Sequence, residues 1–428
     1  MVKYSPYNYK KGNPQMNTCD VHQLDYDLRL ATEEAARCLL CFDAPCSKAC
    51  PADTKPDQFI RAIRFKNIKG AAEIIRNANV CGGSCAIVCP AGKLCEGACL
   101  RKEIDRPIQI RKLQQFAVEQ EMHNNMSILE KSVASKTKAV ACIGAGPASL
   151  ACAAKLVQQG YSVEIYEAQA RAGGMLSYGI PASRLNQKVA DWDIKTVTDL
   201  GVKIHLNTKV GTDISVAELE QKYAAIFVGC GLWRGNKAQL GTLELSGVVS
   251  AMEFLPSVRQ ANYHYPVPAD VVVIGAGDTG MDCASTAKQL GAKNVTIICN
   301  QDEIPAYHEE LELVQKMGIT VLRNFQPNQF LGDKAVTGVV ARHANDFSEI
   351  KLKADLVIWA IGQTLDSPKL LAGMAVVGNK IETHNYQTTK QKYFAAGDAA
   401  NGGSTVVQAV REGKEAAAAI IKFLVDGE

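Results

Sequence analysis

The sequence has few of the features that mark membrane, secreted or nucleic-acid-binding proteins. Its 428 residues contain no apolar run near the roughly 18 residues of a membrane span. The first residues, MVKYSPYNYKKGNPQ, lack the apolar core of a secretory signal. Lysine and arginine (47) nearly balance aspartate and glutamate (44), so no basic surplus points to nucleic acid. We therefore expect a cytoplasmic protein that binds neither membranes nor nucleic acids.

Cysteine is the residue that stands out. Cytosolic thiols stay reduced, so fifteen cysteines in such a protein indicate metal binding rather than a disulfide framework. Ten of the fifteen precede residue 100. The other five lie singly in apolar stretches, where we expect buried thiols without a function: Cys142, Cys152, Cys230, Cys283 and Cys299.

The N-terminal cysteines form two groups, RCLLCFDAPCSKACP at 37–51 and the segment from Cys81 to Cys99. Zinc is one interpretation, because Cys-x-x-Cys is a common half-site, but zinc ribbons usually repeat that pair after a spacer. Each group here contains a Cys-Pro dipeptide, as in ferredoxins, where the last cysteine of a run binds the other cluster. The pattern favours two 4Fe-4S clusters in an α-helical domain, residues 1–125.

Beyond residue 138, short β-branched strands alternate with alanine-rich helices, as in α/β nucleotide-binding domains. The pattern starts twice, in KAVACIGAGPASLACAAKL at 138–156 and in ADVVVIGAGDTGMDCASTAKQL at 269–290. A chain of this length also exceeds what one core usually supports. We predict a multidomain protein in which the α-helical iron-sulfur domain precedes two Rossmann-like α/β dinucleotide-binding domains, the second inserted in the first. The expected bounds are 138–250 plus 380–428 for the FAD domain and 251–379 for the NAD(H) domain.

In the first turn, Gly144 permits a tight bend and Gly146 lets a pyrophosphate approach the positive start of the next helix. The third position is Ser149 instead of glycine or alanine, which departs from the motif. Glu167 ends the next strand, where a carboxylate can accept hydrogen bonds from an adenosine ribose. Strand, turn, helix and acid together predict a dinucleotide site.

The second turn has Gly275, Gly277 and Gly280 in full register. Its next strand ends in Cys299 and Asn300, so it provides neither a ribose-binding acid nor an arginine for a 2′-phosphate. The second site is therefore predicted to take NADH in preference to NADPH.

Two nucleotide sites suggest FAD in one and NAD(H) in the other. A disulfide reductase would also have both sites, but the sequence has no redox Cys-x-x-Cys after Cys41. A flavin accepts two electrons together whereas iron-sulfur clusters carry one at a time, so a protein with both can split an electron pair. No side chain is predicted to act as a catalytic acid or base.

Several stretches together point to one family: RCLLCFDAPCSKACP, CPAGKLCEGAC, PIQIRKLQQFA, GAGPASL, ASRL, GAGDTGMDCAST and NYQTTKQKYFAAGDAA. Over nearly its whole length the chain resembles the flavoprotein subunits of NAD-dependent dihydropyrimidine dehydrogenases and the N-terminal half of the long animal enzymes. The small subunit of bacterial glutamate synthase is a more distant relative, and its cysteine segment fits less well.

The resemblance implies the ligands of both clusters. Those of the first are Cys38, Cys41, Cys46 and Cys99. Those of the second are Cys50, Cys89, Cys95 and Gln114. Cys81 and Cys85 are left over, and either thiol could take the place of Gln114.

The resemblance also implies two sets of nucleotide contacts. The flavin set is Gly144, Gly146, Pro147, Ala148, Ser149, Glu167, Met175, Arg184, Val210, Gly397, Asp398, Thr405 and Val406. The nicotinamide nucleotide set is Gly275, Ala276, Gly277, Asp278, Thr279, Gly280, Asn300 and Gly362. Plain core packing explains Met175 and Val210 equally well, whereas the Arg184 guanidinium suits a pyrophosphate. Relatives that use NADPH carry basic residues where this chain has Asn300 and Gln301.

By this resemblance the chain is the electron-input subunit of a dihydropyrimidine dehydrogenase. NADH would reduce FAD by hydride transfer, and single electrons would pass through two clusters to a partner. That partner would be an FMN- and iron-sulfur-bearing catalytic subunit, PreA in this family, in a heterotetramer that interconverts uracil or thymine and 5,6-dihydropyrimidines. Two alternatives stay open: the NAD(P)H-oxidising small subunit of glutamate synthase or a related ferredoxin-linked oxidoreductase, and a zinc-stabilised adaptor without turnover.

Overall fold

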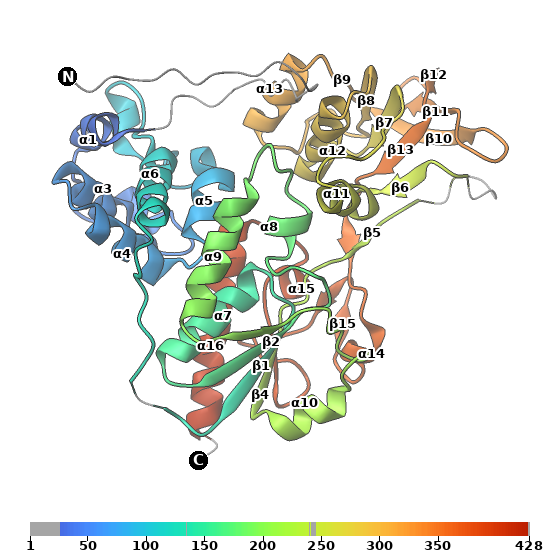
Figure 1. Ribbon diagram of the computed structural model, residues 1–428. Helices are drawn as coiled ribbons and strands as arrows, with labels where there is room; N and C mark the ends of the chain where they lie inside the picture. The colour runs from blue at the N-terminus through green and yellow to red at the C-terminus, as the bar shows by residue number, and fades with distance from the viewer. Residues whose placement is uncertain (1–25, 134, 239, 241–244, 427–428) are drawn as a thin grey trace.

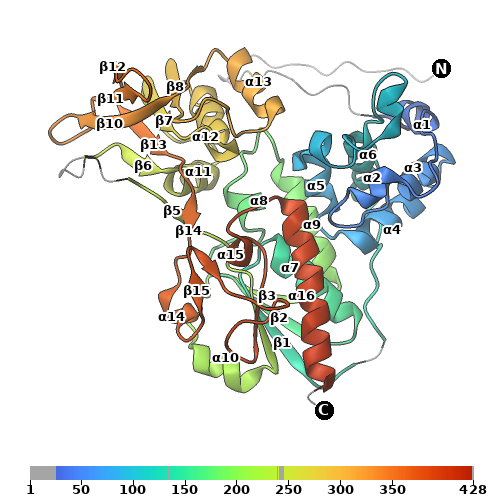
Figure 2. The same ribbon diagram turned by 180° about the vertical axis from the view of Figure 1, so that it is seen from behind.

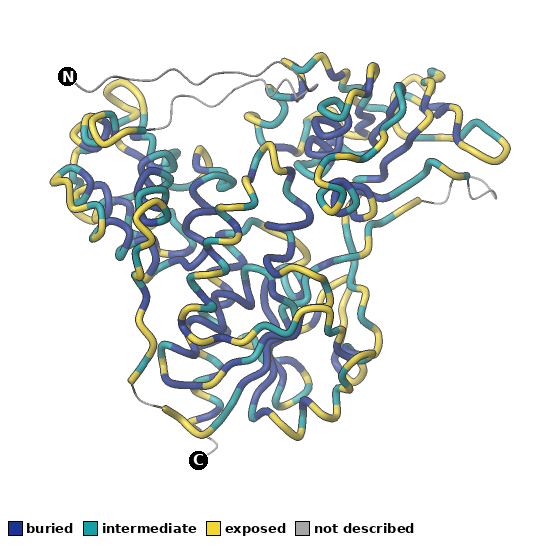
Figure 3. Tube along the Cα trace, viewed as in Figure 1, coloured by how far each residue is buried: buried dark blue, intermediate teal, exposed yellow. Residues whose placement is uncertain are grey.

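The structure is a computed structural model that describes residues 26–133, 135–238, 240 and 245–426. Figure 1 shows three regions: an N-terminal helical region, a first sheet domain that also contains the C-terminal helix, and a second sheet domain from the middle of the chain. Buried segments concentrate in the two sheets and on facing helix surfaces (Figure 3). Among the described helices, none is long and apolar enough to cross a membrane.

The helical region consists of short helices that begin at prolines or polar caps. Pro45 and Pro56 occupy the first helical positions of α2 and α3, where a missing amide hydrogen costs nothing. The side chains of Asp27 and Asn67 accept hydrogen bonds from amides at the starts of α1 and α4. The elements are α1 (Leu28–Ala36), α2 (Pro45–Lys48), α3 (Pro56–Arg64), α4 (Ile68–Ala78), α5 (Gly82–Val88), 3-10 turns η1 (Ala91–Lys93) and η2 (Leu100–Glu103), and α6 (Ile110–His123).

The first sheet domain is built on a five-stranded parallel sheet in the order β17-β4-β1-β2-β3. The strands are β1 (Ala139–Ile143), β2 (Ser162–Tyr166), β3 (Lys203–His205), β4 (Ala225–Val228) and β17 (Tyr393–Ala395). The helices are α7 (Pro147–Gln158), α8 (Met175–Tyr178), α9 (Gln187–Asp199), α10 (Val216–Lys222), α14 (Pro368–Leu371), α15 (Asp398–Asn401) and α16 (Val406–Asp426). Helix α16 lies beside α7 (Figure 2), and Gly413 permits this approach because a Cβ there would lie 2.1 Å from the Ala148 carbonyl oxygen.

The second sheet domain repeats this plan with the strand order β6-β13-β7-β8-β9. Its strands are β6 (Val248–Ser250), β7 (Asp270–Ile274), β8 (Asn294–Ile298), β9 (Thr320–Leu322) and β13 (Leu356–Trp359), and its helices are α11 (Ala251–Gln260), α12 (Asp278–Gln289) and α13 (His308–Lys316). Strand β7 is buried along its whole length, as expected of a parallel strand covered on both faces.

Small antiparallel sheets complete the structure. An antiparallel sheet packs on the second domain and comprises β10 (Phe325–Leu331), β11 (Gly338–His343) and β12 (Glu349–Lys353). Two ribbons pair β5 (Arg234–Gly235) with β14 (Gln363–Thr364) and β15 (Val376–Val377) with β16 (Lys380–Ile381). Because β17 returns to the first sheet after the second domain, the predicted fold class is confirmed. The predicted domain bounds stay predictions.

A buried ion pair joins the helical region to the first sheet domain. The Arg76 guanidinium on α4 contacts Asp193 on α9 at 2.5 Å and Glu121 on α6 at 2.8 Å, and both Arg76 and Asp193 are fully buried. Asp193 also accepts the amide hydrogens of Gly83 and Ser84 at the start of α5. A charge that is buried in this way is tolerated only because it is paired and hydrogen-bonded on several sides.

We predict that Asp193→Ala destabilises the protein by about 3–5 kcal/mol, because it leaves the Arg76 guanidinium buried beside a single carboxylate. The measurement is the thermal unfolding midpoint of the purified protein by calorimetry. Asp191→Ala is the matched control, since Asp191 is on the same helix but its carboxylate is exposed. Equal midpoints for the two variants would contradict the assigned role of the ion pair.

Candidate cofactor-binding sites

One cavity of about 780 Å³ lies between the two sheet domains and the helical region. Most of the predicted nucleotide contacts line it, including both glycine turns, although these begin more than 130 residues apart in the chain. The predicted residues in its wall are Gly144, Gly146, Pro147, Ala148, Glu167, Met175, Arg184, Val210, Gly277, Asp278, Thr279, Gly362, Gly397, Asp398, Thr405 and Val406. Ser149, Gly275, Ala276, Gly280 and Asn300 are not in the wall.

The first glycine turn has the geometry of a phosphate cradle. Gly144 has φ +87°, and a Cβ there would lie 2.7 Å from the Gly229 carbonyl oxygen, so no other residue fits. Gly146 faces open space, which leaves the start of α7 accessible to an anion. The buried Glu167 carboxylate accepts the amides of Ala145 and Gln169, and burial raises its pKa. The turn and its acid therefore fit the diphosphate and ribose of a dinucleotide.

Ser149 departs from the motif without loosening the packing. It is fully buried, and Gly229 at the end of β4 makes room for it, since a Cβ on Gly229 would lie 2.3 Å from the Ser149 hydroxyl. In the second turn the glycine is on the helix: a Cβ on Gly280 would lie 3.7 Å from the Cβ of Ala360, which follows β13. The glycine of this strand–helix contact is thus on the strand side in the first domain and on the helix side in the second.

A second helix start faces the cavity from the C-terminal part of the chain. Gly397 has φ +68°, and its amide donates to Glu412. The Asp398 carboxylate accepts the Ser404 amide, and the Thr405 hydroxyl accepts the Gln408 amide at the start of α16. This arrangement directs the positive end of a 21-residue helix at the cavity, which suits a ligand with negative charge.

The second turn is a structural copy of the first in which the acid is missing. The amide of Glu167 donates to the His205 carbonyl at 2.9 Å, and the amide of Cys299 donates to the Leu322 carbonyl at 2.8 Å. Cys299 therefore takes the place of Glu167 and is buried, while the exposed Asn300 follows it. The predicted absence of a ribose-binding acid is thus seen at the position that the first turn defines.

Arg184 joins the two sheet domains. Its guanidinium contacts Asp282 on α12 at 2.7 Å and Glu310 on α13 at 2.9 Å. Burial raises the Asp282 pKa to about 7, against the lowering effect of Arg184. The residue lines the cavity but already has two carboxylate partners, so its predicted contact with a pyrophosphate stays a prediction.

Sequence reasoning missed several residues of the cavity wall. Tyr307 lines the cavity, and its amide donates to Asp278 at 2.9 Å. Val88 and Pro90 also line it, which brings the backbone on both sides of Cys89 to the nucleotide cavity. No local motif signals these contacts, because each depends on the docking of separate domains.

The four predicted ligands of the first cluster meet in one place. A small apolar cavity is lined by Cys38, Cys41, Cys46 and Cys99. Its other lining residues include Leu39, Ile60, Leu100, Ile108 and Ile110. Burial raises the pKa of Cys46 to about 11, with further contributions from Asp57, Cys38 and Cys99. Four thiols in an apolar pocket suit a cationic metal centre, which supplies the charge that deprotonates them.

The remaining predicted cysteines form a second group next to the large cavity. Burial raises the pKa of the Cys95 thiol, with smaller contributions from Glu96, Cys50 and Cys46. A hydrogen bond with Cys85 raises the pKa of the Cys89 thiol, helped by burial and by Cys95 and Cys50. The two groups are therefore neighbours.

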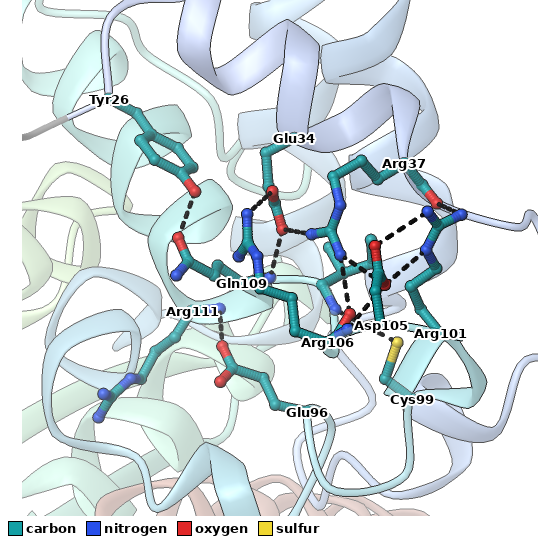
Figure 4. Close-up of polar contacts among 11 residues, drawn as sticks. Tyr26, Glu34, Arg37, Glu96, Cys99, Arg101, Asp105, Arg106, Gln109 and Arg111 are labelled. Atoms are coloured by element: carbon teal, nitrogen blue, oxygen red, sulfur yellow. Dashed lines mark hydrogen bonds and ion pairs between the residues drawn. The ribbon is translucent and has the colours of Figure 1, made fainter. Parts of the chain in front are cut away.

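The predicted eighth ligand lies on α6. Arg111 holds the start of α6. Its guanidinium donates to the Cys89 carbonyl at 2.9 Å. Its amide donates to Glu96 at 2.9 Å (Figure 4). Gln114 follows one turn later, is buried, and its Nε2 donates to the Gly82 carbonyl at 2.7 Å. The amide oxygen, which is the atom able to bind iron, then lies on the other side of the amide. Of the two spare thiols, Cys85 is the one beside Cys89, since the Cys89 amide donates to the Cys85 carbonyl at 3.1 Å.

The described residues give no direct support for a zinc site. Among the described residues, no group of three or more His, Cys, Asp or Glu side chains is placed to hold one metal ion. A cubane cluster is larger than a single ion and keeps its ligands further apart, so this finding is compatible with the predicted clusters.

Comparisons with known proteins agree with this geometry. Residues 15–126 match the family model described as dihydropyrimidine dehydrogenase domain II, 4Fe-4S cluster, and residues 138–413 match that of pyridine nucleotide-disulphide oxidoreductases. The chain is 43% identical over 415 residues to the NAD-dependent dihydropyrimidine dehydrogenase subunit PreT of Salmonella typhimurium, covering 96% of this chain and 98% of that protein. It is 42% identical, with the same coverage, to PreT of Escherichia coli K12.

The chain belongs to the PreT family. It is therefore an oxidoreductase, and FAD, 4Fe-4S clusters and NAD(H) are its cofactors, as the sequence predicts. The glycine turns, the open helix starts and the grouped thiols of this structure fit those cofactors. The residue-level assignments stay predictions.

Solved structures support the fold of the two sheet domains. FprA of Mycobacterium tuberculosis in complex with NADPH has a TM-score of 0.60 and 14% identity to this chain. The match covers 68% of this chain and 86% of the FprA chain. Thioredoxin reductase of T. acidophilum has a TM-score of 0.54 and 21% identity, with coverage of 67% and 99%. Both coverages are consistent with a shared pair of sheet domains, to which members of the PreT family add the cysteine-rich region.

We predict that Gln114→Ala lowers the iron content from about eight to about four per chain, because one cubane loses a ligand. Cys85→Ala is expected to keep about eight irons, and so is Cys283→Ala, a buried cysteine on α12 outside both groups. The measurement is iron and acid-labile sulfide in anaerobically purified protein. Loss of iron in Cys85→Ala with full iron in Gln114→Ala would instead make Cys85 the eighth ligand.

Proposed function

We propose that this chain is the electron-input subunit of an NAD-dependent dihydropyrimidine dehydrogenase. The observation that carries the proposal is a shared cavity. Both glycine turns line it, and so do Val88 and Pro90, the residues on either side of Cys89. Nicotinamide, flavin and the second cysteine group would thus share one enclosure. When bound, FAD accepts two electrons as a hydride from NADH, and the clusters carry them onward singly.

The side chains of the cavity suit binding and positioning rather than proton transfer. Glu167, Asp278 and Asp398 each accept backbone amides, and Asp282 is paired with Arg184. These carboxylates hold turns and domains in place. Hydride transfer requires two rings to be held in register, and side chains that fix the turns and domains around the cavity would serve that positioning.

The proposed acceptor is a separate catalytic subunit that carries FMN and iron-sulfur clusters. It would interconvert uracil or thymine and the 5,6-dihydropyrimidines, in the cytoplasm and within a heterotetramer. The relatives' name, a subunit of dihydropyrimidine dehydrogenase, supports a division of labour between chains. The helical region and the two sheet domains account for the described chain, which supports a pyrimidine site on the partner.

The test is anaerobic purification with and without the partner encoded beside this chain, followed by measurement of iron, sulfide and flavin and of NADH-dependent uracil reduction. We expect about eight irons and one FAD per chain, with uracil reduction only when the partner is present. The same cofactors without uracil reduction would assign the chain to another acceptor, such as a glutamate synthase. Protein without iron and sulfide would refute the electron-input role.

A further prediction concerns nucleotide choice. Asn300→Arg should raise the ratio of kcat/KM for NADPH to kcat/KM for NADH about tenfold or more, because a guanidinium next to Cys299 can pair with the 2′-phosphate. The measurement is steady-state reduction of ferricyanide with each nucleotide. Asn345→Arg, an equal charge change on an exposed loop of the β11–β12 hairpin, is the control. An unchanged ratio in Asn300→Arg would refute the placement of the adenosine ribose.

A further inference from the structure

Two charged side chains that the proposed function does not use lie beside the second cysteine group. Glu96 directly follows Cys95, and its carboxylate accepts the amide hydrogen of Arg111 at 2.9 Å. The Arg111 guanidinium donates to the Cys89 carbonyl at 2.9 Å and to the Ile87 carbonyl at 3.2 Å. One acid and one base are thus placed next to two predicted ligands of the second cluster.

The Glu96 carboxylate is partly buried at the start of α6. In Figure 4 it receives the Arg111 amide, while the Arg111 guanidinium points away from it. The positive end of this 14-residue helix favours the anion. Burial raises the pKa of Glu96, against the lowering effects of the Arg111 amide and guanidinium. A neutral side-chain amide could accept the same hydrogen bond, so capping the helix does not require the negative charge.

The Arg111 guanidinium lies at the end of α5 and also reaches the second sheet domain. Its two carbonyl partners belong to the last residues of α5 and to the residue that follows, where a helix attracts a cation. On its other side it pairs with the Glu309 carboxylate on α13 at 3.3 Å. Glu309 is 67% exposed, so water and salt screen its charge. The cation beside Cys89 is therefore only partly neutralised.

The second cysteine group lies in apolar surroundings. Two of its cysteines and three apolar neighbours pack against the core of the first sheet domain: Cys50, Cys89, Ile87, Val88 and Leu94. Water is partly excluded from such a place, and a charge is screened less there than at the surface. Charged side chains next to these cysteines can therefore influence a neighbouring cluster.

We propose that Glu96 and Arg111 set the reduction potential of the second cluster with opposite effects: Glu96 lowers it and Arg111 raises it. Reduction adds a negative charge to a cluster, so a neighbouring anion opposes the electron and a neighbouring cation favours it. The inference rests on the proposed function, in which single electrons pass from the flavin to the clusters. The balance of the two charges would then decide how readily the second cluster accepts an electron.

The test is a reductive titration of the anaerobically purified, cofactor-loaded protein with titanium(III) citrate at pH 8, followed by EPR spectroscopy. The signal of the second cluster is the one that Cys95→Ala removes. At a fixed potential, Glu96→Gln should raise the ratio of reduced to oxidised second cluster about tenfold, or about 59 mV for one electron. Arg111→Met should lower the same ratio about tenfold. Loosened packing does not predict shifts of opposite sign in the two variants.

Conservative variants separate charge from contact. Glu96→Gln keeps a side-chain oxygen that can accept the Arg111 amide, so its shift reports the lost charge. Arg111→Lys keeps the cation but not the planar guanidinium, and its ratio should stay close to that of the wild type. Glu33→Gln and Arg29→Met are the matched controls, because these residues form an exposed ion pair on α1, outside the second group. Neither control should change the ratio.

A surface variant provides the answer if Glu96→Gln or Arg111→Met loses iron. Glu309→Gln removes the exposed partner of Arg111 and leaves both charges beside the cysteines, so it should raise the ratio by less than Glu96→Gln. Glu312→Gln on the same helix is its control. An unchanged ratio in Glu96→Gln or Arg111→Met, or shifts of the same sign, would overturn this inference alone. Wild-type protein without iron and sulfide would refute the proposed function as well.

Discussion

The buried contact between Arg76 and Asp193 holds the helical region in place against the nucleotide cavity. Asp193 also holds the amides that begin α5, so it sets how α5 lies against the first sheet domain. Helix α5 ends at Val88, and Val88 and Pro90 then reach the wall of the nucleotide cavity. One carboxylate on α9 thereby fixes the distance between the nucleotide site and the nearest cysteine group. Electron transfer between two cofactors depends on such a fixed distance.

The two sheet domains use one design for different ligands. Both have a strand, a glycine turn and a helix whose N-terminus faces the cavity. In both, the residue that follows the second strand donates its amide to a carbonyl of the third strand. They differ in that residue, which is Glu167 in one and Cys299 in the other. A buried carboxylate suits a tightly held ribose, and its absence suits a nucleotide that must bind and leave. The difference lies in side chains while the backbone is preserved.

The cysteine region separates two requirements that compete. The thiols need an apolar, enclosed setting, since water and stray ligands would attack a cluster. The electrons need a way out of the protein. In the structure, Cys89 of the second group lies between two residues of the nucleotide cavity wall, whereas the first group lines a small apolar cavity close to the arginine and carboxylate network. The two cysteine groups thus lie in different surroundings.

Local spacing was enough to predict much of this protein from its sequence. The turns at Gly144, Gly146 and Gly275 could be predicted because turn geometry depends on neighbours in the chain. Resemblance to a family predicted the first group of four cysteines, which line one cavity. The features that the sequence did not reveal depend on segments that meet only after folding. Arg184 pairs with Asp282, 98 residues away, and Gly229 makes room for Ser149. Local hydrogen bonding and sterics determined the turns, whereas the packing of whole domains decided that both nucleotide turns share one wall with Val88 and Pro90, the neighbours of Cys89.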